Sequence, residues 1–190
     1  GELSSCDRYY SINEFSKIYL NKLGIWENLE ISRVIPYSEI EIYLNSMKSI
    51  IFDANEINIS TLGYIVHEGD LVSAVSRLIN SSKKIIKYDK RSYSNSTKDI
   101  NILSSSHDAE CLQEVINYSK HDYNQTAMNI TFNHEIKNER KPRQVFYNNE
   151  ILGLLPIDNQ SYNLIWSVPN AFHKDIEKSS KKDIMNILVK

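Results

Sequence analysis

The strongest constraint on the fold lies between Asn124 and Val168, where four short segments with strand-like composition follow one another closely. These segments are TAMNITFNHE (126–135), RQVFYNN (143–149), EILGLLPI (150–157) and YNLIWSV (162–168). Each contains several apolar residues, with β-branched or aromatic residues among them, which are typical of strands. The polar pair Asn148-Asn149 separates the second segment from the third, as a tight hairpin requires. The region therefore predicts a sheet of at least four sequential, largely antiparallel strands.

Further elements surround this region. Residues 32–54 and 62–66 add strand-like segments, with Pro36 marking an edge or a bend. Apolar residues at helical spacing predict helices over 12–23 and 68–80, and Gly24 stands where the first helix would end. We further expect a short strand at 83–89, a loop at 90–99, a helix at 108–118 and two helices after Pro169. The whole chain, residues 1–190, is predicted to be one α+β domain, a twisted and largely antiparallel sheet flanked by helices.

Composition excludes several classes of protein. The 190 residues are 41% hydrophobic and carry a net charge of −2, so a core is expected and a basic nucleic-acid surface is not. Cys6 and Cys111 make no disulfide framework, which predicts an intracellular, cytoplasmic protein. No apolar run approaches the ~20 residues of a membrane span, and the first ten residues are too polar for a signal peptide. We therefore expect a soluble chain.

Motifs of catalysis and metal binding are missing from the sequence. The five His fall at no metal-ligand spacing, and no CxxC, HExxH, GxSxG or GxGxxG sequence occurs. The pair His121-Asp122 is interpreted as two solvated residues. Glu39, Glu41 and Asp53 are interpreted as surface carboxylates at strand ends. Trp26 and Trp166 are interpreted as aromatic residues of the core. Five Gly are few for a protein that binds a nucleotide, because such sites use Gly to bring backbone N–H groups close to phosphate. The residues alone therefore assign neither a catalytic residue nor a metal ligand.

Four segments, in a fixed order, carry a resemblance to a known family. They are DRYYSINEFSKIYLNKLGIW (7–26), LGYIVHEGDL (62–71), HDYNQTAM (121–128) and the strand pair VFYNNEILGLLPI with YNLIWSVP. Together they resemble the ubiquinone-biosynthesis FAD hydroxylases, which share the para-hydroxybenzoate hydroxylase fold. The chain departs from the family at Gly69, where Arg is usual, and at Glu150 and Gly153, which replace Pro and Ala.

The resemblance implies an aromatic-ring monooxygenase that uses FAD, NAD(P)H and O₂ to hydroxylate a prenylated phenol, a ubiquinone precursor. This chain would supply the substrate-binding sheet. Arg8, Gln125 and Pro156 would contact the cofactor, and Leu152, Leu154 and Trp166 would contact the substrate. The implied partners are other ubiquinone-biosynthesis proteins, a membrane surface touched peripherally, and a second copy of the chain. Self-association would follow from an apolar patch left exposed around Leu152, Leu154, Pro156 and Trp166.

The family's N-terminal GxGxxG unit and its C-terminal Gly-Asp segment are not in this sequence. We therefore expect that the chain alone binds no flavin and is not competent for hydroxylation. Two alternatives stay open: a piece of a longer flavoprotein, or a degenerate relative. A non-catalytic lipid-binding or scaffold protein derived from the same fold is the alternative function.

Overall fold

The computed structural model describes residues 8–45, 47–85, 121–133 and 139–188. The chain divides into two compact units: Gly1–Ser81 with Asn124–Lys190, and Ser82–Tyr123. Most of the second unit lies outside the described residues, and so do the predicted loop at 90–99, the predicted helix at 108–118 and most of the predicted strand at 83–89. The described helices and strands all belong to the first unit.

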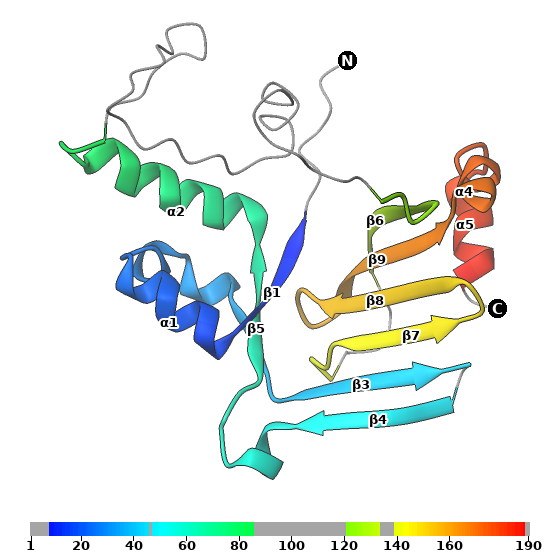
Figure 1. The fold of residues 1–190 in the computed structure, drawn as a ribbon, viewed down its shortest axis with the longest axis horizontal. Helices are drawn as coiled ribbons and strands as arrows, with labels where there is room; N and C mark the ends of the chain where they lie inside the picture. The colour runs from blue at the N-terminus through cyan, green and yellow to red at the C-terminus, as the bar shows by residue number, and fades with distance from the viewer. Residues whose placement is uncertain (1–7, 46, 86–120, 134–138, 189–190) are drawn as a thin grey trace, which may run out of the picture. The chain divides into compact units, whose positions relative to one another are not determined.

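A six-stranded sheet forms the larger part of this unit (Figure 1). Its strands, in spatial order, are β4 (Met47–Asp53), β3 (Glu39–Leu44), β7 (Arg143–Tyr147), β8 (Glu150–Pro156), β9 (Ser161–Pro169) and β6 (Gln125–Asn133). All neighbouring pairs are antiparallel except β3 and β7, which run parallel. The predicted α+β class and the predicted strands between Asn124 and Val168 are thereby confirmed.

Tight turns set the register of the last strands. Tyr147 pairs with Glu150 across a two-residue turn in which Asn148 has a φ of 51°, a conformation that Asn tolerates better than most residues. Between β8 and β9 the Asp158 carboxylate accepts backbone N–H bonds from Gln160 and Ser161, both at 2.7 Å. Local polar residues therefore fix how the three strands align.

Helices cover one face of the six-stranded sheet. Side chains alternate along each strand, so Leu152 and Leu154 share a face of β8 that is opposite to the face of Ile151, Gly153 and Leu155. The former face, here called the covered face, packs with helices α4 (Asn170–Ile176) and α5 (Lys181–Leu188) through a core of Leu164, Trp166, Val168 and Ile176. The opposite face is called the open face. The expected exposed patch around Leu152, Leu154, Pro156 and Trp166 is therefore wrong, because α4 and α5 complete the core there.

A three-stranded antiparallel sheet, in the order β1-β5-β2, makes up the rest of the unit. Its strands are β1 (Tyr9–Asn13), β5 (Gly63–His67) and β2 (Ile35–Tyr37). The helices α1 (Glu14–Lys22) and α2 (Glu68–Ser81) follow β1 and β5 directly, close to the two predicted helices (Figure 1). The Asn13 side chain caps α1 by accepting from Ser16 N, and Gly24 follows the helix with a φ of 74°.

Short 3₁₀ segments connect these elements: η1 (Trp26–Asn28), η2 (Ile31–Arg33) and η3 (Ala54–Ile57). Trp26 is buried with Leu29, Val66 and Ala74, which confirms it as a core aromatic. None of the helices in the described ranges is long and apolar enough to cross a bilayer.

Candidate functional site

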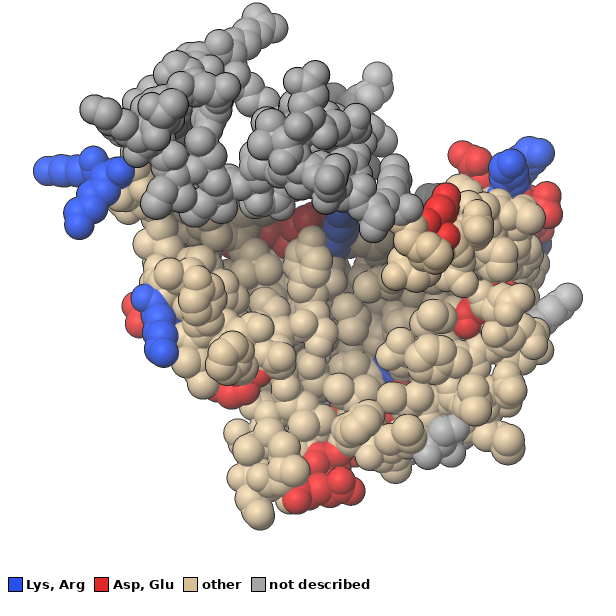
Figure 2. All heavy atoms as spheres, viewed as in Figure 1, with Lys and Arg blue, Asp and Glu red and all other residues tan. Residues whose placement is uncertain are grey.

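A cavity of about 370 Å³ lies on the open face of the six-stranded sheet, with Ser11 of β1 contributing to its wall. Its apolar lining comes from strands β3, β8 and β9, through Ile40, Ile151, Leu155 and Ile165. Its polar lining residues are Ser11, Arg143, Gln144 and Ser167. Figure 2 shows that, in the view of Figure 1, the described surface over the strands carries few charged side chains. An apolar hollow with a few polar groups is the usual form of a small-molecule site.

Gly153 forms part of this cavity from the middle of β8. A Cβ placed on Gly153 would meet no atom nearer than the Ile165 carbonyl oxygen at 3.9 Å, so the packing leaves room for a side chain. Glycine inside a strand weakens it and often marks a position that a ligand approaches closely. The residue therefore keeps the cavity open, and nothing in the surrounding packing requires it.

Two hydrogen-bonded hydroxyl groups lie at the wall of the cavity, to which Ser11 contributes. The Ser11 Oγ and the Tyr37 Oη are 2.6 Å apart, and Tyr37 is only 5% exposed. Gly63 lies directly beneath this contact, because a Cβ there would come within 2.3 Å of the Tyr37 Oη and 2.7 Å of the Ile12 carbonyl oxygen. The absence of a side chain at Gly63 thus allows the Tyr37 hydroxyl to reach Ser11.

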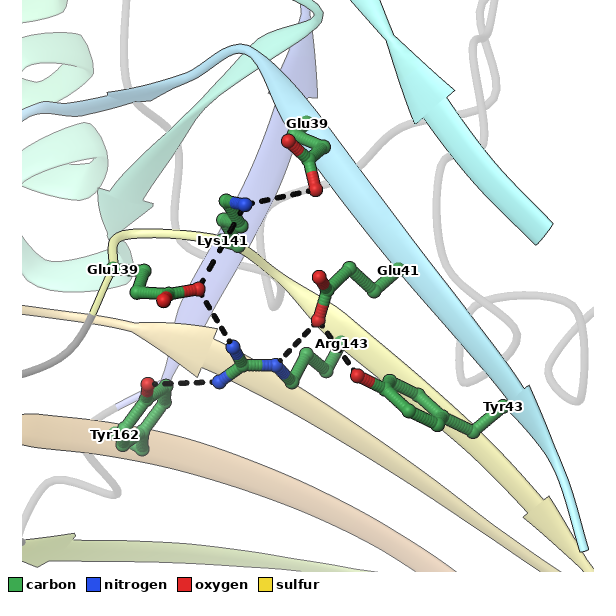
Figure 3. A network of polar contacts seen from close by, with 7 residues as sticks. All are labelled: Glu39, Glu41, Tyr43, Glu139, Lys141, Arg143 and Tyr162. Carbon is green, nitrogen blue, oxygen red and sulfur yellow. Dashed lines mark hydrogen bonds and ion pairs between the residues drawn. The ribbon is translucent and has the colours of Figure 1, made fainter. Parts of the chain in front are cut away.

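A second polar cluster crosses the parallel seam between β3 and β7 (Figure 3). Its centre is Glu41, which is 4% exposed and accepts from the Arg143 Nε and the Tyr43 hydroxyl, both at 2.8 Å. Around this centre, Arg143 also donates to Glu139 and Tyr162, and Lys141 pairs with Glu39 at 3.0 Å. The interpretation of Glu41 as a surface carboxylate is wrong, because Arg143 approaches it from a strand that is distant in the sequence.

This cluster pairs two cations, Lys141 and Arg143, with the three carboxylates of Glu39, Glu41 and Glu139. Burial lowers the pKa of Arg143, but its hydrogen bond to Glu41 and the charges of Glu41, Tyr43 and Tyr162 outweigh that effect and raise the pKa above its ordinary value. Arg143 is therefore a permanent cation whose charge is balanced within the cluster. Arg143 links β7 to β3 through Glu41, and it also borders the cavity, with its charge matched by Glu41 and Glu139.

The residues expected to contact the cofactor lie apart from one another. Arg8 is exposed just before β1, and its carbonyl oxygen accepts from Glu68 N. Gln125 pairs with Pro169 at one end of β9, whereas Pro156 is buried and pairs with Tyr162 near the other end. These two positions are seven residues apart along β9, roughly 23 Å at ~3.3 Å per residue. The structure therefore does not bring Gln125 and Pro156 together.

The residues expected to contact the substrate lie on the covered face. Trp166 is 1% exposed and its Nε1 donates to Glu150 at 2.8 Å, while Leu152 and Leu154 pack against the same core. Trp166 is therefore closed to a ligand, and Leu152 and Leu154 are half-buried against the same core. The cavity is lined instead by the residues next to them in the strands, Ile151, Gly153, Leu155 and Ile165. These residues lie on the open face because side chains alternate along a strand.

The described helix N-termini of the three-stranded sheet do not fit a dinucleotide's pyrophosphate. A phosphate site needs free N–H groups and a positive field at the start of a helix. Here Glu14 lies in the first turn of α1, and Glu68 and Asp70 lie in the first turn of α2. These carboxylates repel an anion. Among the described residues there is also no group of three His, Cys, Asp or Glu placed to hold a metal ion.

Comparisons with known proteins identify the fold and leave the family open. No family model matches the sequence, and no curated protein matches it. The structure is similar to PqsL, a probable FAD-dependent monooxygenase from Pseudomonas aeruginosa, with a TM-score of 0.71 and 11% identity over 97% of this chain and 57% of PqsL. PqsL in complex with 2-aminobenzoylacetate gives a TM-score of 0.63 and 10% identity, over 91% of this chain and 53% of PqsL. The chain thus shares the fold of part of a flavin monooxygenase and spans little more than half of that protein's length.

Proposed function

We propose that this chain supplies the substrate-facing sheet of an FAD-dependent aromatic-ring monooxygenase. The observation that carries the proposal is the cavity on the open face, which Gly153 keeps free of side chains although the packing has room for one. The fold shared with PqsL supports the reaction class. The apolar lining from Ile40, Ile151 and Leu155 suits a ring with hydrocarbon substituents.

The sequence motifs narrow the proposal to the ubiquinone-biosynthesis type of hydroxylase. The substrate would then be a prenylated phenol, with FAD and NAD(P)H as cofactors. A bound flavin supplies the oxygen chemistry, and the protein supplies placement and exclusion of water. Because α1 and α2 begin with carboxylates, the pyrophosphate would need residues other than these two helix N-termini.

The direct test fills the cavity. We expect Gly153→Val to abolish or strongly weaken the binding of 2-prenylphenol. The dissociation constant is measured by NMR titration of the purified chain. The same change should leave the free energy of unfolding unchanged or raise it by a few tenths to about 1 kcal/mol, because Val favours strands and Gly does not. Ala127→Val, on the exposed part of β6 and outside the cavity lining, is the matched control. Equal binding by the wild type and Gly153→Val would refute the cavity as the substrate site.

A non-catalytic lipid-binding or scaffold function is the second candidate, and the acidic starts of α1 and α2 favour it. That function predicts that farnesol, an isoprenoid without a ring, binds as tightly as 2-prenylphenol. The hydroxylase function predicts a clear preference for the phenol. In both cases we expect the purified chain to be colourless, and a stoichiometric flavin absorbance spectrum would contradict the phosphate argument.

A further inference from the structure

The hydrogen bond between the Ser11 and Tyr37 hydroxyls determines the direction in which the Ser11 hydroxyl proton points. Tyr37 is buried, and among the described residues Ser11 is the hydrogen-bond partner of its hydroxyl, at 2.6 Å. Ser11 is exposed and lines the cavity. Each hydroxyl has one proton to donate and can accept through its lone pairs.

Only one direction of this hydrogen bond satisfies the buried group. If Ser11 donated, the Tyr37 proton would be left in the protein interior without an acceptor, and buried donors are almost always paired. Tyr37 therefore donates and the Ser11 Oγ accepts. The Ser11 proton is then free to point into the cavity, and accepting a bond from a phenol strengthens a hydroxyl as a donor. Gly63 holds this arrangement in place, because the Tyr37 hydroxyl occupies the space of its missing side chain.

We infer that Ser11 is a specificity-determining donor that selects ring ligands carrying an acceptor oxygen, and that Tyr37 is its positioning residue. The inference rests on the proposed function, since it assigns the polar end of the same cavity. The body of the ligand packs on Ile40, Ile151 and Leu155, while its carbonyl or phenol oxygen accepts from Ser11. A purely hydrocarbon ring of the same shape leaves the Ser11 proton to water.

The test uses two probes of matched shape. Acetophenone carries a carbonyl acceptor, and cumene replaces that oxygen with a methyl group. Their dissociation constants are measured by NMR titration of the full chain, and the ratio between them is compared across variants, so that the greater hydrophobicity of cumene cancels. Ser11→Ala removes the donor, and Ser32→Ala removes an exposed hydroxyl outside the cavity lining as the matched control. Thermal unfolding of each variant checks that the fold is retained.

Ser11→Ala should shift the ratio against acetophenone by about two- to tenfold, the value of one neutral hydrogen bond at a partly open site. Ser32→Ala should leave the ratio as in the wild type. Tyr37→Phe should give a smaller shift than Ser11→Ala, because Ser11 remains but is no longer held in one orientation; a purely structural role would weaken both probes equally. An unchanged ratio in Ser11→Ala, with both probes bound, would overturn this inference and leave the proposed function standing. If neither probe binds and 2-prenylphenol does not bind either, the proposed function and this inference fail together.

Discussion

The buried pair of Glu41 and Arg143 gives a sharp prediction about stability. Glu41 has a side chain that is 5% exposed, whereas that of Arg143 is 28% exposed and keeps Glu139 as a second anionic partner. Removing the arginine therefore leaves a buried carboxylate without its ion-pair partner Arg143. Removing the glutamate leaves a cation that water and Glu139 still stabilise. The two single substitutions should have unequal effects.

Breaking a buried ion pair by removing one partner costs about 3–5 kcal/mol. We expect Arg143→Met to lower the free energy of unfolding by about 3 kcal/mol, the low end of that range, because water reaches the seam through the arginine side. Glu41→Gln should cost about 1–2 kcal/mol, since the amide oxygen can still accept from Tyr43. The double variant Glu41→Leu with Arg143→Met should recover most of the loss, because no buried charge is left.

Urea unfolding of the wild type, the two single variants and the double variant measures these free energies. The slope of the free energy against urea concentration must stay constant for the comparison to hold. A loss for Glu41→Gln equal to or larger than that for Arg143→Met would refute the assignment of Glu41 as the buried member. A double variant no more stable than Arg143→Met alone would show that the buried charge of Glu41 is not the cause of the loss.

Three further predictions concern single positions. Gly63→Ala should lower the free energy of unfolding by about 1–3 kcal/mol in urea titrations, because its Cβ would collide with the Ile12 carbonyl as well as with Tyr37; an unchanged value would show that the backbone can shift. Leu154→Glu should cost about 3 kcal/mol or more, since it places a carboxylate in the core under α4 and α5, and a fully stable variant would contradict that burial. Burial raises the pKa of Asp158, but the N–H bonds from Gln160 and Ser161 outweigh it and lower the pKa. Its contribution is therefore present above the unfolded value of about 3.9 and is lost as pH falls further, so Asp158→Asn should flatten the stability profile below about pH 4 in thermal unfolding scans.

Local pattern was enough to predict most elements. The helical spacing of residues 12–23 found α1, although Ile12 and Asn13 finish β1 and the helix begins at Glu14. The Asn148-Asn149 pair found the hairpin between β7 and β8. In both cases the signal lies within a few residues of the element that it predicts.

Pairing over long distances could not be predicted in the same way. Glu41 was interpreted as a surface residue because no residue near it in the sequence indicates a pairing with Arg143, which is 102 residues away. Alternation along β8 separates Leu152 and Leu154 from Ile151 and Leu155, but it does not say which face the C-terminal helices cover. The importance of Ser11 was also missed, since its partner Tyr37 lies on another strand. A glycine inside an otherwise apolar strand, as at Gly153, was the one available signal of the cavity.

The parallel contact between β3 and β7 also sets an order of events during folding. The hairpin of β3 and β4 closes locally, and so does the run from β7 to β9, but joining the two requires closure of a loop of about a hundred residues. Contacts of such sequence separation form late, because their entropic cost precedes any stabilisation. We therefore expect the hairpin of β3 and β4, whose strand β4 lies at the edge of the sheet, to open readily in the native state. Its amides, those of Ile50 and Phe52 among them, will exchange with solvent before the amides of β8 and β9.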